Sequence, residues 1–199
     1  MKALKINSFK MAVNFSFIIL LLLSACAQPG SSNNTKSENN SKAKVVVDKP
    51  EIDIQAAILS GNLEVVKQHI EAGTDINMKE QMSGSTPLIT AATFGQTAIV
   101  KALIDANADL DLKNNEGSTA LHSAAFFCRI DIVQMLLDAG ADKNIKNNYE
   151  ATPRESVLVP FSEMKPVYEM IRKQLEPLGL KLDLKELEMT RPIIAMMLQ

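Results

Sequence analysis

Hydrophobic positions in the middle of the chain recur with the spacing of an α-helix. Residues 99–104 carry apolar side chains at positions i, i+1, i+4 and i+5, and residues 132–137 repeat this pattern 33 residues later. Such spacing places one apolar stripe on each helix. A shorter apolar segment precedes each stripe and contains an Ala-Ala pair, at 91–92 and at 124–125. We therefore predict pairs of short helices, in which the alanines let the first helix lie close to its neighbour.

The boundaries of these helices follow the same period of 33 residues. A threonine precedes each predicted first helix, in the dipeptides Thr86-Pro87, Thr119-Ala120 and Thr152-Pro153. A threonine side chain can accept a backbone N–H bond at a helix start, and proline suits the first turn. Gly73, Asn107 and Gly140 stand where second helices end, a place that favours positive φ. A fixed period of this kind indicates stacked repeats that bury their apolar faces against one another.

Two segments, 84–115 and 117–148, resemble the ankyrin repeat, whose pattern is G-x-T-P-L-H-x-A-A-x-x-G-x-x-x-I-V-x-x-L-L-x-x-G-A-D-x-N. A degenerate copy spans 54–77, and a fourth copy begins at 151 and then departs from the pattern. The resemblance implies an all-α ankyrin-repeat solenoid of about three to four repeats over residues 51–160. It also implies that the chain binds another protein and performs no chemistry.

Residues 161–199 are expected to form a C-terminal helical cap. Apolar side chains from Val167 to Leu178 indicate a helix that runs to Glu176, before Pro177. We predict that Thr190 caps a last short helix. Two interpretations remain open: the segment covers the exposed edge of the stack, or it is an amphipathic helix that binds a partner. The adaptable side chains of three methionines favour the second interpretation, Met189, Met196 and Met197.

The N-terminal residues have a different composition. Three lysines and an apolar stretch over 11–23 lead to the sequence Leu23-Ser24-Ala25-Cys26. This order resembles a bacterial lipoprotein signal peptide (1–25), which implies cleavage before Cys26 and a lipid on its thiol. Ala27 follows the cysteine, and by the same resemblance this favours the outer membrane, facing the periplasm. Residues 26–50 are polar, and we interpret them as a flexible linker.

Charge and cysteine content exclude some classes of function. Removal of residues 1–25 takes away three lysines, which leaves 18 basic and 23 acidic side chains and a net charge of −5. Because the chain has no basic patch, we expect no binding of nucleic acid. Cys26 and Cys128 are the two cysteines of the chain. If Cys26 carries lipid, no intramolecular disulfide can form. We expect a monomer.

The sequence offers few groups for catalysis. His122 occupies the histidine position of the repeat pattern, where it is expected to bond to the local turn, and His69 is expected to be exposed. We interpret Cys128 as a small side chain at a tolerant position. Residues 105–116 resemble a calcium-binding EF-hand loop, but Leu110 stands where that loop needs glycine. We therefore predict no enzyme activity, no metal and no cofactor.

The expected binding surface contains a cluster of phenylalanines. Three phenylalanines follow the Ala-Ala pairs, where the family resemblance places the concave face of the stack. Exposed aromatic side chains favour protein binding, but the C-terminal segment could instead fold back over them. The predicted contact residues are those of the hairpin tips and first helices: Met82, Ser83, Ser85, Thr93, Phe94, Asn115, Glu116, Ser118, Phe126, Phe127 and Tyr149.

These observations lead to two hypotheses about function. The first is a membrane-anchored ankyrin-repeat module that mediates protein–protein interaction in the bacterial envelope. The alternative is an inhibitor or immunity-type protein that blocks an envelope toxin or hydrolase. Both would use the same surface, so the sequence does not separate them.

Overall fold

The computed structural model describes residues 49–199, and the regular elements of this part are helices. Cys26, the signal peptide and nearly all of the linker lie outside the described residues. Among the described helices, none is both long and apolar enough to cross a membrane. The first six helices form three pairs: α2 Ile54–Leu59, α3 Leu63–Glu71, α4 Pro87–Phe94, α5 Thr97–Asp105, α6 Ala120–Phe126 and α7 Ile130–Asp138.

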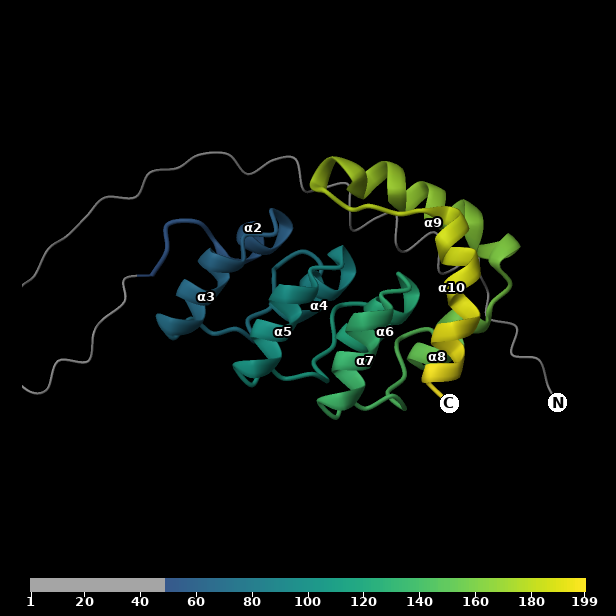
Figure 1. The fold of residues 1–199 in the computed structure, drawn as a ribbon, viewed down its shortest axis with the longest axis horizontal. Helices are drawn as coiled ribbons and strands as arrows, with labels where there is room; N and C mark the ends of the chain where they lie inside the picture. Colours follow the sequence, from purple (N-terminus) through teal and green to yellow (C-terminus); the bar gives the residue numbers. More distant parts are fainter. Residues whose placement is uncertain (1–48) are drawn as a thin grey trace, which may run out of the picture.

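The three helix pairs stack side by side (Figure 1). Within each pair the two helices pack against each other, and the first helices form one row while the second helices form another. Most of the apolar core lies between these rows, including Leu88, Leu103, Leu121 and Leu136, each at most 1% exposed. The all-α solenoid predicted from the sequence is confirmed.

Threonine caps start the first helices α4 and α6, as predicted, and also the helix from Pro153, whereas Asp53 caps α2. Thr86, Thr119 and Thr152 accept hydrogen bonds from the backbone N–H groups of residues 89, 122 and 155. Such caps satisfy N–H groups that have no partner inside the helix, and each contributes about 1 kcal/mol. The second helices end as predicted too, because Gly73, Asn107 and Gly140 have positive φ.

The loops between pairs are tied by side chains that repeat with the same period. Asn115 donates a hydrogen bond to the carbonyl of Met82 at 2.8 Å, and Asn148 donates to the carbonyl of Asn115 at 2.9 Å. Gly84 stands beside the Asn115 side chain with a φ of +67°, so any Cβ there would clash with it. Each hairpin is therefore fixed to the next one by an asparagine bond.

The fourth repeat is completed in an unexpected way. Its first helix is α8 (Pro153–Leu158), but the next helix, α9 (Phe161–Leu175), does not pair with it as a second helix. Instead α9 lies across the ends of the first helices, as Figure 1 shows. After the short 3-10 turn η1 (Glu176–Leu178), α10 (Leu184–Met197) returns and packs against α8 and α7. The helix α10 thus occupies the place of the missing second helix.

Two details of this C-terminal arm (residues 161–199) correct the sequence analysis. The prediction that Thr190 caps a short last helix is wrong, because α10 begins at Leu184 and Asp183 accepts hydrogen bonds from its first N–H groups. Thr190 is buried within α10. The helix α9 ends at Leu175, one residue before the predicted end, and continues into η1.

His69 is a further correction, because its side chain is buried and not exposed. Its two ring nitrogens lie 3.0 Å from Thr74 Oγ1 and 2.8 Å from the carbonyl oxygen of Ile52. Both partners lie outside α3, one on each side of it in the chain. A helical pattern alone could not show that these loops cover the last turn of α3.

Candidate binding cavity

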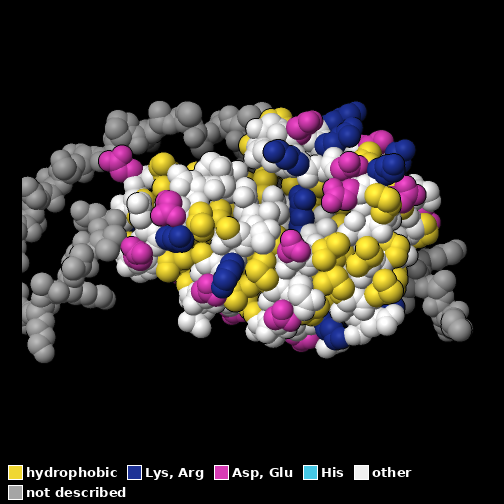
Figure 2. Space-filling view, viewed as in Figure 1, with side chains coloured by type: hydrophobic (Ala, Val, Ile, Leu, Met, Phe, Trp, Pro, Cys, Tyr) yellow, Lys and Arg dark blue, Asp and Glu magenta, His cyan; other side chains and the backbone are white. Residues whose placement is uncertain are grey.

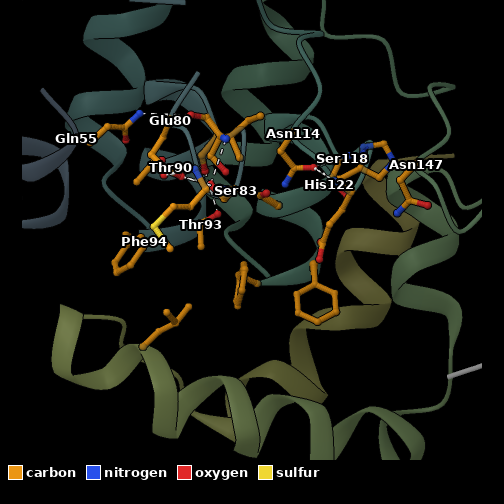
Figure 3. A pocket seen from close by; sticks show the side chains of 18 of the residues that line it. Gln55, Glu80, Ser83, Thr90, Thr93, Phe94, Asn114, Ser118, His122 and Asn147 are labelled. Carbon is orange, nitrogen blue, oxygen red and sulfur yellow. Dashed lines mark hydrogen bonds between the residues drawn. The ribbon is translucent and has the colours of Figure 1, made fainter. Parts of the chain in front are cut away.

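A cavity of about 220 Å³ lies between the repeats and the C-terminal arm. Figure 3 shows its repeat side, where labelled residues come from first helices and hairpin turns and face α9. Its lining extends from Gln55 on α2 to Ser156 on α8. Leu175 and Leu178 close it from the arm. The cavity therefore follows the concave face of the whole stack.

Ten of the eleven predicted contact residues line this cavity: Met82, Ser83, Ser85, Thr93, Phe94, Glu116, Ser118, Phe126, Phe127 and Tyr149. The exception is Asn115, whose exposed side chain bonds the neighbouring hairpin. The repeat period brought these residues together because equivalent positions of stacked repeats lie next to one another.

Two of the phenylalanines are not free to contact a partner. Phe126 and Phe127 are 6% and 4% exposed, and their rings pack edge to face with centroids 5.0 Å apart. The ring of Tyr168 from α9 lies 4.9 Å from that of Phe126. Of the two alternatives left open by the sequence, the C-terminal segment does fold back over these rings. Phe94 remains half-buried at the cavity.

A buried polar network holds α9 in this position. Tyr168 donates a hydrogen bond from its hydroxyl to the carbonyl of Phe126 at 2.7 Å. Arg191 from α10 donates one bond to that hydroxyl at 2.7 Å and another to the carbonyl of Val159 at 2.6 Å. Burial raises the pKa of Tyr168, which keeps the hydroxyl protonated and able to donate. The network therefore joins α6, α9 and α10.

Glu80 lies on the cavity wall with its carboxylate already satisfied. It accepts bonds from the backbone N–H groups of Met82 and Ser83, at 2.5 and 2.8 Å, and from the Ser83 hydroxyl at 2.6 Å. Burial alone would raise its pKa, but these hydrogen bonds outweigh that effect and lower it. Glu80 thus closes its own turn as a carboxylate.

Glu116 is in the opposite situation. Its carboxyl lines the same cavity but pairs with no donor or cation among the described residues. Burial raises its pKa to about 7. Tyr149 lies near enough for the Glu116 charge to add to the effect of burial, and the pKa of its phenol rises to about 12. An acid without a partner beside aromatic rings is a group that a ligand could satisfy.

His122 forms part of the cavity wall but is held as a structural group. Its Nδ1 accepts the backbone N–H of Thr119 at 3.2 Å, which leaves Nε2 to donate to the carbonyl of Ala151 at 3.0 Å. Burial lowers its pKa to about 4. The neutral ring ties repeat three to the start of α8, in agreement with the local bonding expected from the sequence.

Cys128 also has a structural environment. It adopts a φ of 54° at the position where the repeat pattern has glycine, and its thiol lies 3.8 Å from the carbonyl oxygen of Leu187. Burial raises the pKa of the thiol to about 11, which disfavours the reactive thiolate.

The acidic loop that resembles an EF-hand has another role in the structure. Asp111 accepts the backbone N–H of Asp142 from the next repeat at 3.0 Å. Asp109 donates its backbone N–H to the side-chain oxygen of Asn77 at 2.9 Å. Within the described residues, no group of three or more His, Cys, Asp or Glu side chains could hold a metal ion.

Several lining residues were not predicted from the sequence, among them Thr90, Asn114 and Asn147. The two asparagines stand 33 residues apart, and each side chain accepts two backbone N–H bonds from its own hairpin turn. The period could therefore have identified them. Leu175 and Leu178 gave no such signal, because the path of α9 depends on contacts distant in the sequence.

Known proteins share this repeat architecture. The family model for ankyrin repeats matches residues 54–147 in three copies. The chain is 41% identical over 63 residues to protein phosphatase 1 regulatory subunit 27 of Homo sapiens, and equally to that of Mus musculus. These matches cover 32% of this chain and 40% of each relative, so the chain spans less than half of their length.

A solved structure agrees with these matches. The ankyrin repeat domain of Bcl-3, described as a unique member of the IkappaB family, superimposes with a TM-score of 0.50 at 31% identity. That likeness covers 52% of this chain and 45% of the other. Residues 54–147 of this chain are therefore three ankyrin repeats.

Proposed function

We propose that this chain is a protein-binding module held at the bacterial envelope by a lipid on Cys26. The observation that carries the proposal is the stack of three ankyrin repeats, a type of repeat that mediates binding to other proteins. The two curated relatives are named as regulatory subunits, which fits a role in binding without catalysis. The neutral, hydrogen-bonded His122 and the inert Cys128 thiol support the same conclusion.

The sequence supports the anchoring half of the proposal. Basic residues, an apolar stretch and Leu23-Ser24-Ala25-Cys26 follow one another in the order of a lipoprotein signal. Two lipid signals suffice for stable anchoring, and a lipoprotein cysteine carries several acyl chains. Ala27 favours the outer membrane, with the repeats facing the periplasm.

The anchoring can be tested by metabolic labelling with palmitate and by membrane fractionation. Wild-type chain should take up label and sediment with the envelope, whereas Cys26→Ser should remain unlabelled as uncleaved precursor or soluble product. A matched Cys128→Ser variant should label as the wild type does. Label retained in Cys26→Ser would show that the anchor is elsewhere.

Two surfaces are available for a partner. The first is the cavity with its rim of hairpin residues. The second is an exposed apolar stripe on α10, where Met189, Ile193 and Met196 are 60%, 43% and 61% exposed. Figure 2 shows hydrophobic side chains gathered over this part of the molecule. The spacing i, i+4, i+7 places all three on one face of the helix.

Affinity purification from detergent-solubilised envelopes distinguishes these surfaces. We expect the full-length chain to recover a partner, and we expect the recovered amount of that partner to fall when Met82→Ala is combined with Phe94→Ala. The matched control is Met189→Ser combined with Met196→Ser on α10. If the α10 variant loses the partner and the cavity variant keeps it, binding occurs on the outer face. If the wild-type chain enriches no protein over a Cys26-anchored tag control, the protein-binding proposal fails.

A further inference from the structure

The shape of the cavity favours an elongated occupant. Its lining runs along four successive first helices, from α2 to α8. Packed helices lie roughly 8–10 Å apart, so the lining extends over about 25–30 Å. An extended chain rises about 3.3 Å per residue, so roughly eight residues would run along this length, with only those side chains that fit the cavity of about 220 Å³ reaching beneath the arm.

The polar groups on the wall fit a peptide backbone. Hydroxyl groups of serines and threonines recur along the lining, at 83, 85, 90, 93, 118 and 123. The hydroxyls of Ser83 and Thr93 already donate to Glu80 and to the carbonyl of Ile89, so towards a ligand they can only accept; the other hydroxyls can both donate to and accept from backbone amides. Phe94 and Tyr149 belong to the same lining, and their rings can contact apolar parts of a side chain. The lining therefore offers hydrogen bonds and apolar contact along its length.

The charge of the wall selects one kind of side chain. The ionisable residues of the lining are Glu80, Glu116, His122 and Tyr149. The Glu80 carboxylate is engaged in its own turn, and His122 is held between two backbone groups. Glu116 alone keeps a free carboxyl, with Tyr149 nearby. A cation on an apolar stem complements this combination, because it can pair with the carboxylate and lie over an aromatic ring.

We infer that the cavity binds an extended segment of a partner protein and that a lysine or arginine of this segment pairs with Glu116. This inference rests on the proposed protein-binding function and adds the partner's chemistry. The other candidate occupants are residues 26–48 of the same chain, which include three lysines, and a second copy of this chain.

Site-specific photo-crosslinking in the full-length, lipidated chain tests the occupant. The photo-reactive amino acid benzoylphenylalanine replaces Met82 at the cavity, and mass spectrometry maps the linked segment. We expect a segment of another protein with Lys or Arg within a few residues of the link. The yield should fall in Glu116→Gln and stay unchanged in Glu71→Gln, an exposed control. Links only to residues 26–48, links only to a second copy, or a yield independent of Glu116 would each overturn the inference.

Binding of a synthetic peptide with the linked sequence provides the quantitative test. Measured at pH 8, Glu116→Gln should weaken binding about tenfold or more, as should replacement of the peptide's basic residue by methionine. The two changes together should weaken it no further than either alone, because both remove the same pair. Additive losses would overturn the inference. If the cavity gives no cross-link while purification still recovers a partner through α10, the inference fails and the proposed function stands.

Discussion

The repeat stack and the C-terminal arm are both helical, but different interactions place their helices. In the stack, equivalent residues meet across a constant period, and buried polar side chains such as Thr86, Thr119 and His122 bond within their own repeat or to the start of the next one. In the arm, no period operates, and Tyr168 and Arg191 form a buried polar network with backbone carbonyls. A repeated local rule thus builds the stack, whereas specific long-range hydrogen bonds position the arm.

This difference has a consequence for the concave face. Here α9 covers its aromatic end, burying Phe126 and Phe127, and a cavity with a free carboxyl remains beneath the arm. The arm therefore narrows the concave face to a cavity, the feature on which the proposed extended ligand rests.

The largest expected effect comes from the core of the stack. Leu103 is 0% exposed in α5 of the middle repeat. Leu103→Ala should lower the free energy of unfolding by about 2–5 kcal/mol, because it removes buried methyl groups and leaves a cavity. Urea denaturation followed by circular dichroism measures this. Leu158→Ala, at a side chain 50% exposed, is the control and should change stability by less than about 0.5 kcal/mol. Equal effects of the two variants would contradict the description of the core.

The arm should respond to loss of a single hydroxyl. Tyr168→Phe removes the hydrogen bond from the hydroxyl to the Phe126 carbonyl and the bond that the hydroxyl accepts from the Arg191 guanidinium. We expect a loss of about 2–3 kcal/mol, since two buried hydrogen bonds are lost and one of them involves a charged group. Hydrogen exchange should become faster in α9 and stay unchanged in α4 and α5. Tyr149→Phe is the matched control. Uniformly faster exchange would show that arm and stack unfold as one unit.

Glu116 makes stability depend on pH at the boundary between the two regions. Its pKa is about 7 in the folded chain, above the ordinary value of 4.5, so the folded state binds more protons between these values. Stability from this group is therefore present below pH 4.5 and lost as pH rises through 7. Tyr149, Glu80 and His122 also line the cavity, and a Glu116→Gln variant keeps all three of these ionisable groups.

Glu116→Gln should remove this dependence. At pH 8 the variant should be more stable than wild type by about 1–2 kcal/mol, allowing for partial solvent screening of the carboxyl. At pH 4 the difference should vanish. His122 titrates in the same range in both proteins, so the difference between their denaturation curves isolates Glu116. A constant difference across pH 4–8 would contradict the assignment.

The smallest effect on stability should come from the exposed stripe of α10. Replacing Met189 and Met196 by serine should change the free energy of unfolding by about 0.5 kcal/mol or less, because both side chains are mostly exposed. Thermal unfolding measures this. A larger loss would show that these methionines pack within the arm, and their use as a binding-surface control would no longer be valid.

Sequence periodicity predicted more of the stack than of the arm. The threonine caps and the positive-φ residues followed from the 33-residue spacing. The same spacing placed ten of the eleven proposed contact residues along one cavity, and their contact with a partner stays a prediction. The periodicity did not predict where α10 starts, that His69 is buried, or that the Glu116 carboxyl has no hydrogen-bond donor or cation beside it among the described residues. Each of these depends on which distant segment lies nearby, and a single-sequence pattern carries no such information.

The sequence by itself determined the helix pairs and their stacking, because each repeat carries its own cap and apolar stripe. Only the tertiary structure decided that α9 crosses the concave face and that α10 takes the place of the fourth repeat's second helix. The physical reason is range. Capping and helical periodicity act between residues a few positions apart, whereas Tyr168 reaches Phe126 across 42 positions and Arg191 reaches Val159 across 32.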